Sequence, residues 1–147
     1  MSQNLSRGSD TLAKALEQRI VYVQGRLPDL DLPRQGYDII FSNSLLHHLP
    51  DPSALWKTLL KYAEPGARIA LMDLLRPHSK QQAQALLNTY AGNEPEILQR
   101  DFYHSLLAAF TVEEIERQLA DAGLPLTVGR VSDRHCFISG RMPERKK

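Results

Sequence analysis

Two apolar runs with a helix between them set the fold class of this chain. Asp38–Phe41 and Arg68–Met72 are mostly apolar without alternation, which is typical of strands that helices cover on both faces. Asp51 is suited to cap a helix between them, Pro52 suits its first turn, and Pro65–Gly66 is expected to end it. A right-handed crossover of this kind joins parallel strands. We therefore expect an α/β fold with a mostly parallel sheet and helices on both faces.

The remaining elements follow from periodicity and from capping signals. Thr111 and Glu114 form a capping box, in which each side chain satisfies an exposed backbone donor, and Gly123 is expected to end that helix. The short link around Ser132-Asp133 requires the last two strands to be antiparallel. We expect helices over 9–18, 79–91, 96–109 and 111–122, a short strand over 20–23, and a hairpin of strands over 126–131 and 135–140.

Composition narrows the class of protein. A length of 147 residues, with 42% hydrophobic and 24% charged residues, fits one globular domain, which we expect to span residues 1–147. The formal net charge of +1 argues against a strongly electrostatic nucleic-acid binder. The single cysteine, Cys136, excludes an internal disulfide and fits a reducing compartment. No apolar run approaches the about 20 residues of a membrane span, and the start of the chain has no signal-peptide core. A cytoplasmic domain without nucleic-acid or membrane partners is expected.

Six segments follow one another along nearly the whole chain. They are IVYVQG (20–25), YDIIFSN (37–43), LLHHLPDP (45–52), EPGARIALMDLLRP (64–77), FTVEEIERQLADAGL (110–124) and SDRHCFISG (132–140). In order and spacing they resemble class I S-adenosylmethionine-dependent methyltransferases. The resemblance implies a Rossmann-like methyltransferase sheet, S-adenosylmethionine as the cofactor and, for an active protein, a small-molecule methyl acceptor.

The sequence also departs from that family. The first strand, the Gly-rich turn, the first helix and the second strand have no counterpart, and no two of the eight glycines are separated by one residue. Such a turn lets the backbone approach the cofactor closely. Arg26 stands where many family members place an Asp that accepts from the adenine amino group, and an Arg cannot accept. We therefore expect an incomplete sheet and a truncated methyltransferase, inactive as an isolated chain. The alternative is a non-enzymatic binding or regulatory subunit built on a degenerate methyltransferase fold.

Polar residues follow Asp38–Phe41 at the end of the strand. Open α/β sheets bind ligands at the carboxyl ends of their strands. The turn has an alternative interpretation, in which its polar residues only cap the strand. Arg26 also has an alternative interpretation, as a side chain on the surface. By resemblance, the cofactor-binding residues are Arg26, Leu27, Ser42, Asn43, Ser44 and Leu45.

A His-His pair supplies the catalytic candidates, His47 and His48. Imidazole titrates near neutral pH and can act as a general base, whereas the alternative is a structural His that bonds the loop backbone. No Asp, Glu or Cys pattern completes a metal site, so no metal is expected. By resemblance, the substrate side of the site holds Asp73, Arg76, Tyr103 and His104.

Two polar groups also have structural interpretations. The structural interpretation of Asp73 and Arg76 is a salt bridge within the loop, without a role in binding the substrate. Asp133, Arg134 and His135 form a polar cluster in the terminal hairpin, for which we favour a structural hydrogen-bonding role.

The missing family strands leave one sheet edge without a partner. By resemblance they would separate Ile20–Val23 from Asp38–Phe41. Either Ile20–Val23 moves in beside Asp38–Phe41, or the edge pairs with another chain, because unpaired N–H and C=O groups invite strand addition. We therefore expect a homodimer or a partner chain that covers this edge.

Overall fold

The computed structural model describes residues 19–144 and divides the chain into two compact units, Met1–Leu32 and Pro33–Lys147. In the first unit, Ile20–Val23 forms no strand, and the side chain of Tyr22 is 87% exposed. The predicted strand is therefore wrong, because β-branched and aromatic residues form a strand only where a neighbouring strand supplies a ladder. The predicted helix over 9–18 lies outside the described residues.

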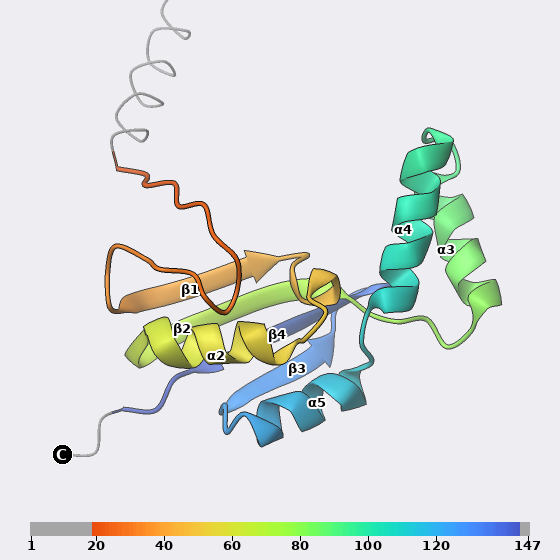
Figure 1. Ribbon diagram of the computed structural model, residues 1–147. Coiled ribbons are helices and arrows are strands. Elements are labelled where there is room, and N and C mark those ends of the chain that lie inside the picture. Colours follow the sequence, from red (N-terminus) through yellow and green to blue (C-terminus); the bar gives the residue numbers. More distant parts are fainter. Residues whose placement is uncertain (1–18, 145–147) are drawn as a thin grey trace, which may run out of the picture. The chain divides into compact units, whose positions relative to one another are not determined.

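The second unit is built on a mixed sheet. Its strands are β1 (Tyr37–Asn43), β2 (Ala63–Leu74), β3 (Leu126–Arg130) and β4 (His135–Arg141), in the order β1-β2-β4-β3 (Figure 1). The pair β1–β2 is parallel, as predicted, and the hairpin β3–β4 is antiparallel, as predicted. The chain returns through β4 into the place beside β2, also antiparallel, so the described sheet is mixed rather than mostly parallel.

Helix α2 (Ser53–Tyr62) begins as the sequence predicts but ends earlier. The Asp51 carboxylate accepts hydrogen bonds from the N–H of Ser53 at 2.9 Å and from its hydroxyl at 2.7 Å. Pro65–Gly66 does not end the helix and instead lies inside β2. Gly66 has a φ of +75° there, which glycine adopts easily. Its N–H donates to the carbonyl of Met142 at 3.2 Å, so this residue is bonded within the sheet region.

Two helices cover one face of the sheet. Helix α5 (Val112–Asp121) starts at the predicted capping box of Thr111 and Glu114, and Gly123, with a φ of +66°, follows its end. It lies beside α2 (Figure 1), and the indole N–H of Trp56 donates to Oε1 of Gln118 at 3.1 Å. The buried residues of this layer include Leu55, Trp56, Leu59, Ile69, Leu71, Ile115, Leu119 and Ile138.

The opposite face of the sheet is open in the second unit. Register places Ile39 beside Arg68 and Phe41 beside Ala70, so these side chains share one face. Ile39 is 63% exposed and Phe41 is 80% exposed. No helix of residues 33–144 shields these two side chains from water.

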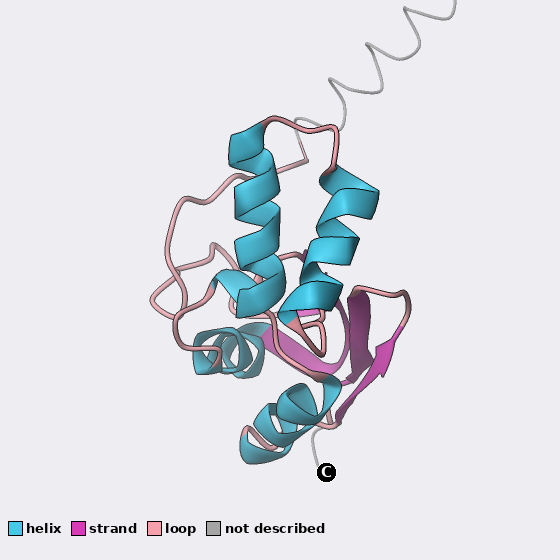
Figure 2. Cartoon of the chain, turned by 90° about the vertical axis from the view of Figure 1, so that its right-hand side faces the viewer, coloured by secondary structure: helices cyan, strands magenta, loops and turns pink. Residues whose placement is uncertain are grey.

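A helical hairpin stands at the carboxyl ends of β1 and β2. Helices α3 (Lys80–Ala91) and α4 (Glu96–Ala108) lie side by side there (Figures 1 and 2). Leu74 at the end of β2 packs with them, and α4 also contacts the short 3₁₀ helix η1 (Leu46–His48) that follows β1. None of the described helices combines the length and apolarity that a membrane crossing requires. The hairpin therefore walls the sheet end that carries the candidate residues.

Candidate functional site

The polar turn after β1 lies against the end of β2. Asn43 is in register with Met72, and the N–H of Ser44 donates to the carbonyl of Met72 at 2.9 Å. Ser44 has a φ of +57°, which is uncommon for a residue with a side chain and occurs mainly at turns and functional sites. Asn43 and Ser44 are exposed, while Ser42 and Leu45 are half-buried. The predicted polar turn therefore opens to solvent at the carboxyl end of a parallel pair.

Asp73 lies underneath this turn and is only 3% exposed. Its Oδ2 accepts from the N–H of Leu46 at 2.7 Å, and its Oδ1 accepts from Nδ1 of His47 at 2.5 Å and from the N–H of Leu74 at 2.8 Å. Burial by itself raises the pKa of Asp73, but these hydrogen bonds and the charge of His47 outweigh it, so the pKa lies below 3.8. Asp73 is thus an ionised carboxylate that fixes the loop between the two strands.

Asp73 does not pair with Arg76, so the loop salt bridge considered from the sequence is wrong. Nη2 of Arg76 instead lies 2.5 Å from Oε1 of Glu114, and its Nη1 donates to the carbonyl of Ala109 at 3.3 Å. Arg76 therefore ties the end of β2 to the start of α5. Glu114 was identified from the sequence only as a capping residue, because separation along the chain carries no signal for this pair.

His47 and His48 have different environments, although they are adjacent. His47 is 8% exposed, and an ionised Asp73 requires its Nδ1 to carry the proton. In residues 19–144, no hydrogen-bond partner faces its Nε2, and no buried polar side-chain atom lacks a partner, so Nε2 keeps access to solvent. His48 is exposed, and its ring centroid lies 4.0 Å from that of His47. The pair therefore offers one oriented and one free imidazole.

The other predicted residues are not all brought together. Tyr103 is half-buried and packs against the apolar cluster of Leu74, Ala83, Leu86, Leu106 and Ala109. Its ring centroid lies 6.3 Å from that of the exposed His104. Arg26 and Leu27 belong to the first unit, in which Arg26 is exposed and Leu27 is half-buried. The structure thus joins Asn43, Ser44, both histidines and Asp73, and leaves Tyr103 mainly as a packing residue.

The terminal hairpin has the structural hydrogen bonds that we favoured. The Ser132 hydroxyl lies 2.9 Å from Nδ1 of His135, and the Tyr90 hydroxyl donates to Asp133 at 2.6 Å. The guanidinium of Arg134 lies 3.4 Å from the Tyr90 ring centroid, and the Arg134 carbonyl accepts from the N–H of Leu75 at 2.8 Å. Tyr90 was not identified from the sequence, since nothing along the chain links α3 to this turn.

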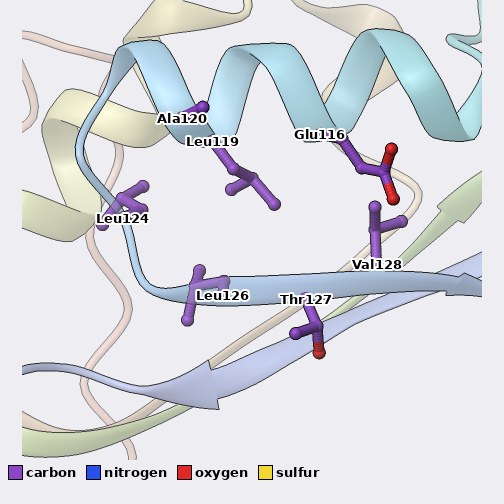
Figure 3. A pocket seen from close by; sticks show the side chains of 7 residues that line it. All are labelled: Glu116, Leu119, Ala120, Leu124, Leu126, Thr127 and Val128. Carbon is purple, nitrogen blue, oxygen red and sulfur yellow. The ribbon is translucent and has the colours of Figure 1, made fainter.

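One surface groove lies elsewhere, between α5 and β3. It has a volume of about 400 Å³ and contains none of the candidate residues. Figure 3 shows the groove and its lining, which is formed by Glu116, Leu119, Ala120, Leu124, Leu126, Thr127 and Val128.

In the described part of the chain, no three His, Cys, Asp or Glu side chains gather closely enough to hold a metal ion.

Sequence comparison gives a family and a curated relative. The profile of the family described as "Methyltransferase domain" matches residues 7–127. The 27-O-demethylrifamycin SV methyltransferase of Amycolatopsis mediterranei (strain S699) is 26% identical over 124 residues, which are 83% of this chain and 42% of the relative.

Solved structures share the fold. A SAM-dependent methyltransferase from Aquifex aeolicus has a TM-score of 0.58 at 17% identity, over 97% of this chain and 65% of the other. A plantazolicin methyltransferase, in complex with a monoazolic desmethylPZN analog and SAH, has a TM-score of 0.56 at 18% identity, over 80% of this chain and 55% of the other. This chain therefore spans less than two thirds of the length of these relatives.

Proposed function

Because this chain belongs to the methyltransferase-domain family, we propose that its His47–Asp73 pair serves methyl transfer from S-adenosylmethionine to a hydroxyl group. The pair is the single observation that carries the proposal. A hydroxyl is a poor nucleophile until a base takes its proton, and the pair provides an oriented base at the carboxyl ends of two parallel strands. The curated relative, whose name specifies a 27-O acceptor, supports the same class of chemistry.

Asp73 and His47 divide the work between them. Asp73 holds Nδ1 of His47 protonated, which leaves the lone pair of Nε2 to accept the proton of the acceptor hydroxyl. The carboxylate also stabilises the imidazolium that forms. When bound, the cofactor supplies an electrophilic methyl group on a sulfonium. The rest of the rate enhancement comes from alignment of the hydroxyl oxygen with that methyl group.

Residues around the pair are proposed to hold the two ligands. We propose that Ser42, Asn43, Ser44 and Leu45 contact the methionyl part of the cofactor, largely through the backbone of the turn. His48 and His104 are exposed and are proposed to contact a small-molecule acceptor.

The chain offers only part of a cofactor site. The turn at Asn43 and Ser44 is exposed, which supports its proposed contact with the methionyl end, whereas the sequence has no GxG turn for close backbone approach. Arg26 cannot accept from the adenine amino group, although its guanidinium can stack on a ring. We propose that polypeptide beyond these 147 residues supplies the missing contacts. The same gap favours the second candidate function, a non-enzymatic binding or regulatory subunit.

Calorimetric titration with S-adenosylhomocysteine separates the two functions. The chain alone should give no saturable binding up to millimolar ligand, where a site of about 4 kcal/mol would show. A fusion of the chain behind the strand, Gly-rich turn, helix and strand of a family member should bind saturably. A matched fusion with both turn glycines replaced by valine controls for binding elsewhere.

Two other results of the titration would contradict the proposal. A folded fusion that does not bind would reject the methyltransferase function and favour the non-enzymatic subunit. Saturable binding by the chain alone would show that no further polypeptide is needed.

The free edge of β1 and the cellular location of the protein are the subjects of two further proposals. We propose that a second chain covers the free edge of β1, since the described residues place no strand there. A cytoplasmic location is proposed from the single cysteine, Cys136, which is buried and unpaired.

A further inference from the structure

The outer edge of β1 has the properties of a pairing surface. β1 comes first in the strand order, and in residues 19–144 its partner is β2 on one side only. The strand, YDIIFSN, contains none of the Lys or Pro residues with which proteins commonly protect a sheet edge. Its exposed side chains include Ile39 and Phe41, which are large and apolar.

The backbone of β1 alternates in the direction of its hydrogen-bonding groups. The N–H of Ser44 points to β2, where it donates to the carbonyl of Met72. By the alternation of a strand, even-numbered residues direct their N–H and C=O groups to β2, and odd-numbered residues direct theirs to the free edge. In an antiparallel pair, two residues exchange hydrogen bonds only when both are directed outward. The outward residues are Tyr37, Ile39, Phe41 and Asn43.

We propose that two copies of this chain pair antiparallel along β1, with Ile40 on the two-fold axis. This register aligns all seven residues of the strand and places every outward residue opposite another. Ile39 lies opposite Phe41 of the second copy, and an aromatic residue beside a β-branched one is a favourable cross-strand pair.

The charges of the strand also fit a second copy. Asp38 is the only charged residue of β1, and this register places it opposite Ser42 of the second copy, so no like charges meet. Ile39 and Phe41 lie on the open sheet face, where both residues of each copy meet across the axis. The two sheets join into one continuous sheet, which removes the free edge from both copies.

The dimer has one consequence that rests on the proposed function. The strands that the family resemblance places beside β1 need the same edge, so pairing between copies and completion of the cofactor site exclude each other. The pairing itself concerns the 147-residue chain and is tested without any ligand.

Sedimentation equilibrium over a concentration series is the first test. The chain should have twice the mass of one 147-residue copy, and Phe41→Lys should shift it to one copy. Leu60→Lys is the matched control, because Leu60 is an exposed apolar residue that belongs to α2 and not to β1, and it should leave the dimer intact. A dimer that persists in Phe41→Lys would overturn the proposal.

Disulfide trapping tests the register. In the proposed dimer the two Ile40 Cα atoms face each other at about 4.5 Å, within the range that a disulfide spans. Ile40→Cys should therefore crosslink with oxidised glutathione, which is reduced to two thiols as the protein disulfide forms. Asp38→Cys should not, because its two copies lie on the order of 13 Å apart along the strands. The native Cys136 is buried and should not contribute.

Other occupants of the edge give different results. Efficient crosslinking of Asp38→Cys, or none of Ile40→Cys in a dimer, would reject this register. A monomer whose Ile39 and Phe41 amides exchange slowly with deuterium would show that the chain covers its own edge, and the proposal would fall.

Discussion

Asp73 shows how one residue takes its role from its neighbours. Along the chain it is a polar residue after an apolar strand, suited to a rim. In the fold it is buried and accepts from Leu46, His47 and Leu74. A buried carboxylate with this many donors stays ionised, and losing its charge leaves those donors with a weaker acceptor.

Acid should therefore weaken the fold through Asp73. Because the folded pKa is below the 3.8 of the free group, the stabilisation is complete above pH 3.8 and is lost as pH falls through the folded pKa. Urea unfolding between pH 6 and pH 2.5 measures it as a fall in the free energy of unfolding. Asp73→Asn should cost about 2 kcal/mol near neutral pH and flatten this acid limb. The exposed Asp38→Asn serves as the control, and an equally steep limb in Asp73→Asn would assign the loss to other carboxylates.

His47 and His48 should differ in turnover. In a cofactor-binding fusion, His47→Gln should lower kcat about 10²- to 10⁴-fold, the usual contribution of a general base. His48→Gln should mainly raise KM for the acceptor, because this ring is exposed and unbonded to Asp73. Release of S-adenosylhomocysteine measures both, with 27-O-demethylrifamycin SV as the first acceptor probe. If His48→Gln lost as much kcat as His47→Gln, the base would not be His47 alone.

Among the helices, local signals predict the starts and most of the ends, and the end of α2 is the exception. Asp51, Ser79 and Thr111 all accept hydrogen bonds at the helix starts where the sequence places them. The predicted end of α2 is wrong, because residues 63–66 belong to β2. They pair there with β1 and with the segment around Met142. A capping side chain acts within three residues, whereas a strand needs partners from elsewhere.

The capping box of α5 should contribute measurably to stability. Thr111→Ala removes the acceptor for the Glu114 N–H and should lower the free energy of unfolding by about 1 kcal/mol. Thr89→Ala is the matched control, since Thr89 is an exposed residue inside α3 and alanine favours helix there. Urea denaturation compares them, and equal stabilities would exclude a contribution from the box.

The last strand of the described residues lies inside the sheet. β4 pairs with β2 on one side and with β3 on the other, and Cys136 and Ile138 on it are fully buried. β4 therefore connects the parallel pair β1–β2 to β3 within the sheet.

Removal of β4 should abolish folding. A chain that stops at Val131 loses both ladders of the inner strand and exposes Leu71 and Leu126, so we expect no cooperative urea transition by circular dichroism. A chain that lacks only residues 145–147 is the matched control and should unfold as the full chain does. A cooperative transition in the shorter chain would show that β4 is dispensable.

Patterns of neighbouring residues are enough to predict the α/β class, the parallel pair β1–β2, the terminal hairpin, the helix caps and the family. Each of these depends on periodicity, on a cap or on a short link, which are properties of neighbouring residues. The sequence also named His47 and His48 as catalytic candidates and Asp73 as a substrate-side residue, but it did not predict that Asp73 bonds His47.

Which side chains meet depends on how the elements pack. Asp73 bonds His47 rather than Arg76, Arg76 bonds Glu114, and Ile20–Val23 forms no strand in its unit. Contacts between residues 26 or 38 positions apart depend on how strands align and helices pack, and this leaves no periodic trace along the chain. The pattern of residues thus determined the elements, and packing determined the chemistry at the carboxyl ends of β1 and β2.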